Sequence, residues 1–182
     1  QHNFHIFYYF YDYMNSEKTL RDYNLASNRG YRYLRIQPDY QQTKLKYARE
    51  DPKGNAENFR QFEAILQDLD FNRKQLETIR KVLAAILNMG NIRFRPSGKY
   101  AEVENTDMVS RIADLLRVDE KKFMWSLTNF IMVKGGIAER RQYTSEEARD
   151  ARDAVASTIY SRLVDWIINK INMNMSFPRA VL

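Results

Sequence analysis

The segment from Lys134 to Arg141, KGGIAERR, holds three cations and one anion within a short stretch. Such a cluster has two interpretations. It forms a solvated turn whose charges keep it in water, or it forms an electrostatic contact for an acidic partner, with Lys134, Arg140 and Arg141 providing the attraction. The Gly135-Gly136 pair permits an unusual backbone or a close approach of the partner. Charge alone favours the solvated turn.

A second charged segment extends from Arg95 to Asp107 and mixes both signs. Arg95 and Lys99 are followed by carboxylates at Glu102, Glu104 and Asp107. A mixed loop of this kind is expected to adjust the specificity of a contact rather than to supply its affinity.

No combination of residues predicts catalysis or metal binding. His2 and His5 are three positions apart, which places them close together on a helix, but no carboxylate or cysteine cluster completes a metal site. His5 is expected within an aromatic core. The phosphate-binding pattern G-x-x-x-x-G-K-[ST] is missing, because Gly98-Lys99 is followed by Tyr100. We therefore predict no catalytic, cofactor-binding or metal-binding residue in this chain.

Composition bounds the class of protein. The chain has 182 residues, 44% of them hydrophobic, which suffices for one domain with a core. A net charge of +6 suits an acidic partner such as a protein surface, nucleic acid or anionic membrane. The absence of cysteine excludes a disulfide framework. No apolar run approaches the roughly 18 residues of a membrane span, so we expect a soluble, intracellular chain.

One long helix, Thr144 to Asn174, directly follows the basic segment and would hold it in place. Thr144 and Glu147 have the spacing of a capping box. At about 1.5 Å per residue the helix would be roughly 45 Å long and would need a large partner surface. Its apolar stripe, with spacings of three and four, comprises Ala148, Ala151, Val155, Ile159, Leu163, Trp166 or Ile167, and Ile171.

The remaining pattern predicts a mainly α-helical fold with short strands. Aromatic residues 4–14 favour a helix, and a helical pair follows over 59–69 and 72–89, with a capping box at Asn72 and a left-handed Gly90 after it. Short strands are expected in 31–36 and 91–94, with polar connections over 37–58 and 95–105. Thr106 and Asp119 are candidate N-caps of two shorter helices. Residues 130–143 favour a hairpin or extended loop.

Three ordered segments resemble the myosin motor domain. NFHIFY at 3–8, VLAAILNMGNIRF at 82–94 and RDAVASTIYSRLVDWIINKIN at 152–172 are similar to motifs of that family in the same order. The resemblance covers nearly the whole chain. The FPRAVL ending and the tyrosine-rich opening also resemble class III myosins of photoreceptor type.

The resemblance implies an ATP-driven, actin-based motor of the P-loop NTPase superfamily, located in the cytoplasm with the cytoskeleton. Residues 1–182 would be most of its upper 50-kDa subdomain, lacking the nucleotide-binding core. The P-loop, switch I and switch II would lie outside them, so that ATP and Mg²⁺ belong to the intact motor and this chain alone would be inactive. Residues 134–143 would be the cardiomyopathy-type loop and 95–107 would be loop 4. The residues implied in actin binding are Lys134, Gly135, Gly136, Ile137, Glu139, Arg140, Arg141, Arg95 and Lys99.

Some positions depart from the family pattern. His2 replaces a common arginine, and Val164 replaces the usual phenylalanine of an RLFDW motif. Many myosins place an acidic or phosphorylatable residue sixteen positions before Asp153. That position is Ile137 here, and Glu139 would supply an acid after a two-residue shift. The competing hypothesis is a free-standing basic helical adaptor that binds nucleic acid or an acidic protein surface.

Overall fold

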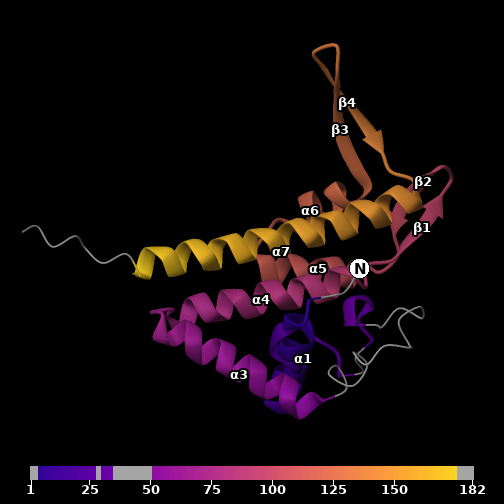
Figure 1. Cartoon of the computed structure of the whole chain (residues 1–182). Coiled ribbons are helices and arrows are strands. Elements are labelled where there is room, and N and C mark those ends of the chain that lie inside the picture. Colours follow the sequence, from indigo (N-terminus) through magenta and orange to yellow (C-terminus); the bar gives the residue numbers. More distant parts are fainter. Residues whose placement is uncertain (1–3, 28–29, 35–50, 176–182) are drawn as a thin grey trace, which may run out of the picture.

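The computed structural model describes residues 4–27, 30–34 and 51–175. Within them the fold is mainly helical, with two separate two-stranded antiparallel sheets. Figure 1 shows the long helix α7 lying across the other helices, while one hairpin projects from the body. The helices are α1 (Ile6–Ser16), α3 (Pro52–Asp68), α4 (Arg73–Met89), α5 (Thr106–Leu116), α6 (Glu120–Thr128) and α7 (Ser145–Met175), with the short 3₁₀ helices η1 (Leu20–Tyr23) and η2 (Arg32–Leu34). The strands are β1 (Phe94–Ser97), β2 (Tyr100–Val103), β3 (Asn129–Lys134) and β4 (Ile137–Gln142).

Helix α4 is the centre of the core and packs against α5, α7 and α1. Its start is the predicted capping box: the Asn72 side chain accepts from the Gln75 N–H at 3.0 Å, and the Gln75 side chain accepts from the Asn72 N–H at 2.9 Å. Every residue from Leu83 to Met89 is buried. Because this C-terminal part of α4 is buried on all sides, it fixes the positions of the elements around it.

Helices α1 and α3 pack against each other below α4 (Figure 1). Phe10 and Phe59 are fully buried at their contact, with ring centroids 5.5 Å apart. Buried Asp12 accepts a 2.8 Å hydrogen bond from the Asn55 side chain. The aromatic stripe of α1 is therefore core, as expected, although His5 is exposed rather than enclosed.

Helix α7 confirms the predicted capping box. The Glu147 carboxylate accepts from the Thr144 N–H at 2.8 Å, and the Thr144 hydroxyl accepts from the Glu147 N–H at 3.3 Å. Ala148 and Leu163 of the predicted stripe are buried, and Val155, Ile159, Ile167 and Ile171 pack at the edge of the core. Trp166 of the predicted stripe is 37% exposed and makes a T-shaped ring contact with Phe71.

Several further expectations from the sequence were wrong. The strand expected over 91–94 begins only at Phe94, and most of the polar connection 95–105 is a β-hairpin whose turn has Gly98 at φ 63°. Gly90 has a right-handed backbone, with φ −58°. Glycine is needed there because a side chain has no room: a Cβ would lie 2.8 Å from the Tyr33 ring. Thr106 is the first residue of α5 and not its N-cap.

Two more errors concern the chain between α1 and α4. Residues 32–34 form a 3₁₀ helix where a strand was expected. Helix α3 begins at Pro52, well before Phe59, because Asp51 caps it by accepting from the Gly54 N–H at 3.0 Å and proline suits a first helical position. The expectations for His2, for residues 35–50 and for the FPRAVL ending concern residues outside the described ones.

Candidate partner-binding hairpins

The basic segment forms the turn and second strand of the β3–β4 hairpin. The two strands are antiparallel, with Lys134 opposite Ile137 and Asn129 opposite Gln142. The connecting residues Gly135 and Gly136 have φ of 58° and 79°. Two residues with positive φ make the tight turn that matches the twist of paired strands, and glycine adopts it without a side-chain clash. The glycine pair is therefore required by the hairpin itself.

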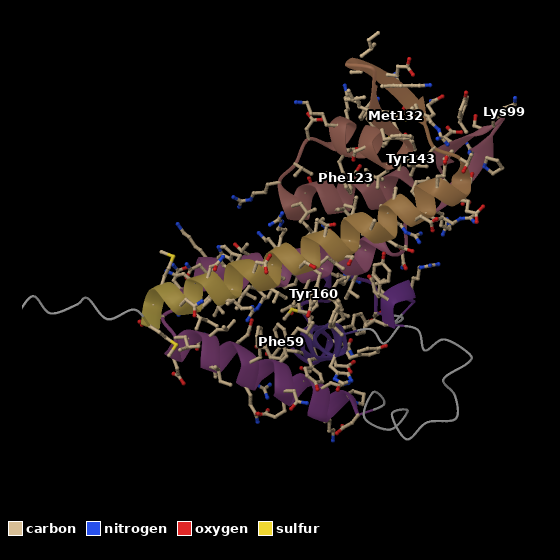
Figure 2. The ribbon with its side chains drawn as sticks, turned by 45° about the horizontal axis from the view of Figure 1, so that its top comes forward. Phe59, Lys99, Phe123, Met132, Tyr143 and Tyr160 are labelled. Atoms are coloured by element: carbon tan, nitrogen blue, oxygen red, sulfur yellow. The ribbon has the colours of Figure 1, made fainter. Side chains whose placement is uncertain are left out.

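The outer part of this hairpin presents apolar surface to solvent. Ile131, Val133 and Ile137 are 62%, 71% and 67% exposed. Because side chains alternate along paired strands, Ile131, Val133, Ala138 and Arg140 share one face, and Met132, Lys134, Ile137, Glu139 and Arg141 share the other. Figure 2 shows Met132 on the projecting hairpin and Tyr143 at its base. Both faces thus combine aliphatic groups with cations.

Arg141 is committed to contacts within the chain. Its guanidinium lies 5.3 Å from the centroid of the Phe130 ring and forms an ion pair with Glu147. The N–H of Thr144, and after it the charge of Arg141, lower the pKa of the Glu147 carboxyl. Arg141 therefore joins the second strand of the hairpin to the cap of α7.

Arg140 points to the opposite face and makes different contacts. Its Nε donates a 2.9 Å hydrogen bond to Oδ1 of Asn129, and its guanidinium lies 5.6 Å from the centroid of the Trp125 ring on α6. Asn129 is buried. Neither Trp125 nor Asn129 was among the predicted site residues. The position of Trp125, four residues before the hairpin, was the only signal in the sequence.

Tyr143 joins the two hairpins at their bases. Its N–H donates to the Thr128 carbonyl at 2.9 Å, and its carbonyl accepts from the Ala101 N–H of β2 at 2.8 Å. Its ring stacks on Phe130 with centroids 4.9 Å apart. The two segments expected to act together are therefore adjacent, and a shallow recess lined by Tyr100, Arg140, Arg141 and Gln142 lies beside this junction.

The β1–β2 hairpin carries the other two predicted site residues. Arg95 forms an ion pair with Glu102, its register partner, at 3.1 Å. Lys99 lies exposed at the tip, where Figure 2 labels it, and forms no ion pair with any described residue. Of the two cations, Lys99 is the one whose charge is not offset by a neighbouring carboxylate.

A polar network anchors α7 beyond its cap. Arg152 is buried and donates from Nη1 to the Ile92 carbonyl at 2.8 Å and from Nε to Asp153 at 2.9 Å. Burial opposes ionisation of Asp153, but hydrogen bonds from Arg152 and Tyr33 lower the pKa of its carboxyl. Burial and the neighbouring Asp153 raise the pKa of Tyr33. The network holds α7 to η2 and to the connection between α4 and β1.

The chain matches the family model of the myosin head (motor domain) over residues 1–181. The chain therefore belongs to the myosin head family. It is 78% identical over 181 residues to "Neither inactivation nor afterpotential protein C" of Drosophila melanogaster. The matched region covers 100% of this chain and 12% of that protein. It is 36% identical over 178 residues to human Myosin-IIIa, covering 93% of this chain and 11% of that protein.

More distant members include the Drosophila melanogaster protein "Unconventional myosin ID", 29% identical over 178 residues, covering 97% of this chain and 16% of that protein. The family assignment confirms the resemblance inferred from the three ordered motifs, and the human relative agrees with the class III resemblance. The chain spans 11% to 16% of the length of these relatives.

In the part of the chain that the structure describes, no helix is both long and apolar enough to cross a membrane. Within the same ranges, 4–27, 30–34 and 51–175, no group of three or more His, Cys, Asp or Glu side chains is placed to hold a metal ion.

Proposed function

We propose that this chain supplies an actin-contacting surface to an ATP-driven cytoskeletal motor, as part of the upper 50-kDa subdomain. The projecting β3–β4 hairpin is the observation that carries the proposal. It offers exposed aliphatic side chains and cations at its outer end, while its base is tied to the body by Tyr143 and Arg141. Membership of the myosin head family supports actin as the acidic partner.

The hairpin is suited to docking because its conformation is set before the partner arrives. A tight glycine turn and continuous strand pairing leave little backbone freedom to lose on binding. Ile137 and Val133 supply the apolar contact, and Lys134 supplies long-range attraction to acidic groups. Lys99, on the β1–β2 hairpin, extends the positive charge from the neighbouring element. Glu139 and Arg95 tune the local charge.

Helix α7 is the proposed connection between this surface and the nucleotide site of the whole motor. Its cap contacts the hairpin through Arg141, and its second turn is fixed to the α4–β1 connection through Arg152. Displacement of the hairpin would therefore move α7. ATP and Mg²⁺ are expected in the intact motor, located in the cytoplasm with the cytoskeleton, and we assign no residue of this chain to them.

The alternative of a free-standing basic adaptor for nucleic acid or an acidic protein has no observation of its own. Part of the positive charge that motivated this alternative is neutralised within the chain, since Arg95 pairs with Glu102 and Arg141 pairs with Glu147. The family match accounts for the hairpin more directly.

The test is sedimentation of the intact motor protein with actin filaments across salt concentrations. Ile137→Asp and Lys134→Glu should each weaken binding on the order of tenfold, since an apolar or attractive contact becomes repulsive. Ile65→Asp and Lys53→Glu are matched controls on α3, remote from the hairpin: Ile65 is 58% exposed and Lys53 is exposed. If the hairpin variants bind as the α3 controls do, the hairpin is not the actin-contacting surface.

A further inference from the structure

We propose that Arg140 is a preoriented receptor for a single carboxylate of the partner, while Arg141 has no such role and serves to join the hairpin to α7. This inference rests on the proposed function, because it names the chemistry by which one side of the β3–β4 hairpin recognises its acidic partner. The two arginines are adjacent in sequence but lie on opposite faces of the hairpin.

The first step is the orientation of the guanidinium from behind. Arg140 Nε donates to Oδ1 of Asn129 at 2.9 Å. Asn129 is 5% exposed, and its own Nδ2 donates to the Trp125 carbonyl at 3.0 Å and to the Thr128 hydroxyl at 2.9 Å. The donor contacts of Nδ2 fix which end of the amide faces Arg140. A buried side chain thus holds the exposed arginine.

The second step is the support of the guanidinium plane. The centroid of the Trp125 ring, on α6, lies 5.6 Å from the Arg140 guanidinium carbon, within the range of a cation–π contact. Arginine ordinarily loses considerable side-chain freedom when it binds a ligand. Here the fold has already imposed much of that restriction, so that less remains to be lost when a partner arrives.

The third step is the edge that remains open. With Nε occupied, the terminal nitrogens Nη1 and Nη2 of Arg140 form no hydrogen bond or ion pair with the described residues. Their parallel N–H groups match the two oxygens of a carboxylate. Ile131, which is opposite Arg140 in the register and 62% exposed, and Val133 lie on the same face of the hairpin as Arg140. Aliphatic neighbours exclude water from a bound ion pair and strengthen it.

Arg141 differs in each respect. It already pairs with Glu147, and its guanidinium lies over Phe130 on the other face of the hairpin. An external carboxylate would have to compete with Glu147, whose ionised form is favoured by the α7 cap. The fold therefore assigns the two neighbouring cations to different tasks.

The test uses the intact motor protein, actin filaments and a salt titration. Arg140→Lys keeps the charge but removes the fork and most of the stacking, so actin affinity should fall on the order of tenfold with little change in the salt dependence. Arg141→Lys is the matched control and should change affinity by less than about twofold. Trp125→Phe, with a weaker cation–π partner, should give an intermediate loss.

A double-mutant cycle identifies the partner group. Neutralising actin carboxylates one at a time should reveal one whose removal weakens binding of the unmodified motor clearly more than binding of Arg140→Lys. The same cycle remains decisive if hydrogen exchange shows that Arg140→Lys loosens the hairpin. A loosened hairpin would weaken binding to every actin variant alike, whereas a direct pair couples Arg140 to one actin carboxylate only. Equal affinities for Arg140→Lys and Arg141→Lys, or no coupled carboxylate, overturn the inference. If Ile137→Asp still weakens binding in that case, the proposed function remains.

Discussion

The hydroxyl of Tyr33 donates a 2.6 Å hydrogen bond to Oδ1 of Asp153, joining residues that are 120 positions apart in the chain. The same oxygen accepts from Nε of Arg152, and Arg32 pairs with the other carboxylate oxygen at 3.2 Å. The Asp153 carboxylate therefore accepts from three residues, two of them on η2 and one on α7. The position of η2 depends on this carboxylate.

Asp153→Asn should destabilise the folded chain by about 1–3 kcal/mol, because it removes the charge that these donors satisfy. Folding lowers the pKa of Asp153, so the folded state favours the ionised carboxylate. That stabilisation is complete above the ordinary aspartate pKa of about 3.9 and is lost as pH falls through the lower folded-state value. Chemical denaturation at several pH values should show the gap between Asp153→Asn and the unmodified chain closing in acid. A gap that is constant with pH would contradict the assignment.

Arg80 and Arg60 provide a matched pair of ion-pair deletions. Arg80 binds both oxygens of Glu63 at 2.6 Å, with the Glu63 side chain only 8% exposed. Arg80→Ala would leave that buried carboxylate without its cation and should lower the free energy of unfolding by about 3–5 kcal/mol. Arg60→Ala removes a cation that is more than half exposed beside Glu57, and should change stability little. Denaturation midpoints of the two variants test this; equal midpoints would show that burial does not distinguish the pairs.

Thr144→Ala should loosen the first turn of α7, because the Thr144 hydroxyl accepts from the Glu147 N–H. Loss of an N-cap costs about 1 kcal/mol. Hydrogen exchange should therefore become faster in the first turn of α7 but not around Leu163, which is buried in the core. Thr158→Ala, within the same helix, is the control, since its hydroxyl only contacts the carbonyl of Ala154. Uniform loosening of α7 would mean that the cap does not act locally.

Gly136→Ala should weaken the β3–β4 hairpin although there is room for a methyl group. No atom lies within 4 Å of the added Cβ, but φ is 79°, so the cost is backbone strain of about 1–2 kcal/mol. Amide exchange in β3 and β4 should accelerate, and actin affinity of the motor should fall. Gly98→Ala, at φ 63° in the other hairpin, should loosen β1 and β2 instead. A Gly136→Ala hairpin with unchanged exchange would contradict the turn geometry.

Local signals predicted the elements whose ends carry caps or turns. The boxes at Asn72 and Thr144 predicted the starts of α4 and α7, because the side chain and the backbone it satisfies lie within four residues. The sequence around Gly135-Gly136 indicated a hairpin or an extended loop, and the structure has the hairpin. The β1–β2 hairpin was missed because its outer face is polar and only Phe94, Ala101 and Val103 are buried.

Tertiary contacts decided what the sequence did not indicate. Gly90 has the position of a left-handed helix end, but its role is to admit the Tyr33 ring, a residue from a distant segment. Similarly, Arg140 and Arg141 have the same chemistry in the sequence. Their different roles depend on Trp125, Asn129 and Glu147, which lie on three other parts of the fold.

The β3–β4 hairpin belongs to no larger sheet, so along most of its length both outer edges carry backbone groups without a strand partner among the described residues. Such edges can pair with a neighbouring molecule, and exposed aliphatic side chains increase the hazard of aggregation. The charged side chains Lys134, Glu139, Arg140 and Arg141 oppose it, because identical hairpins brought edge to edge would place like charges together. A variant that neutralises them all would therefore be expected to lose solubility as well as partner binding.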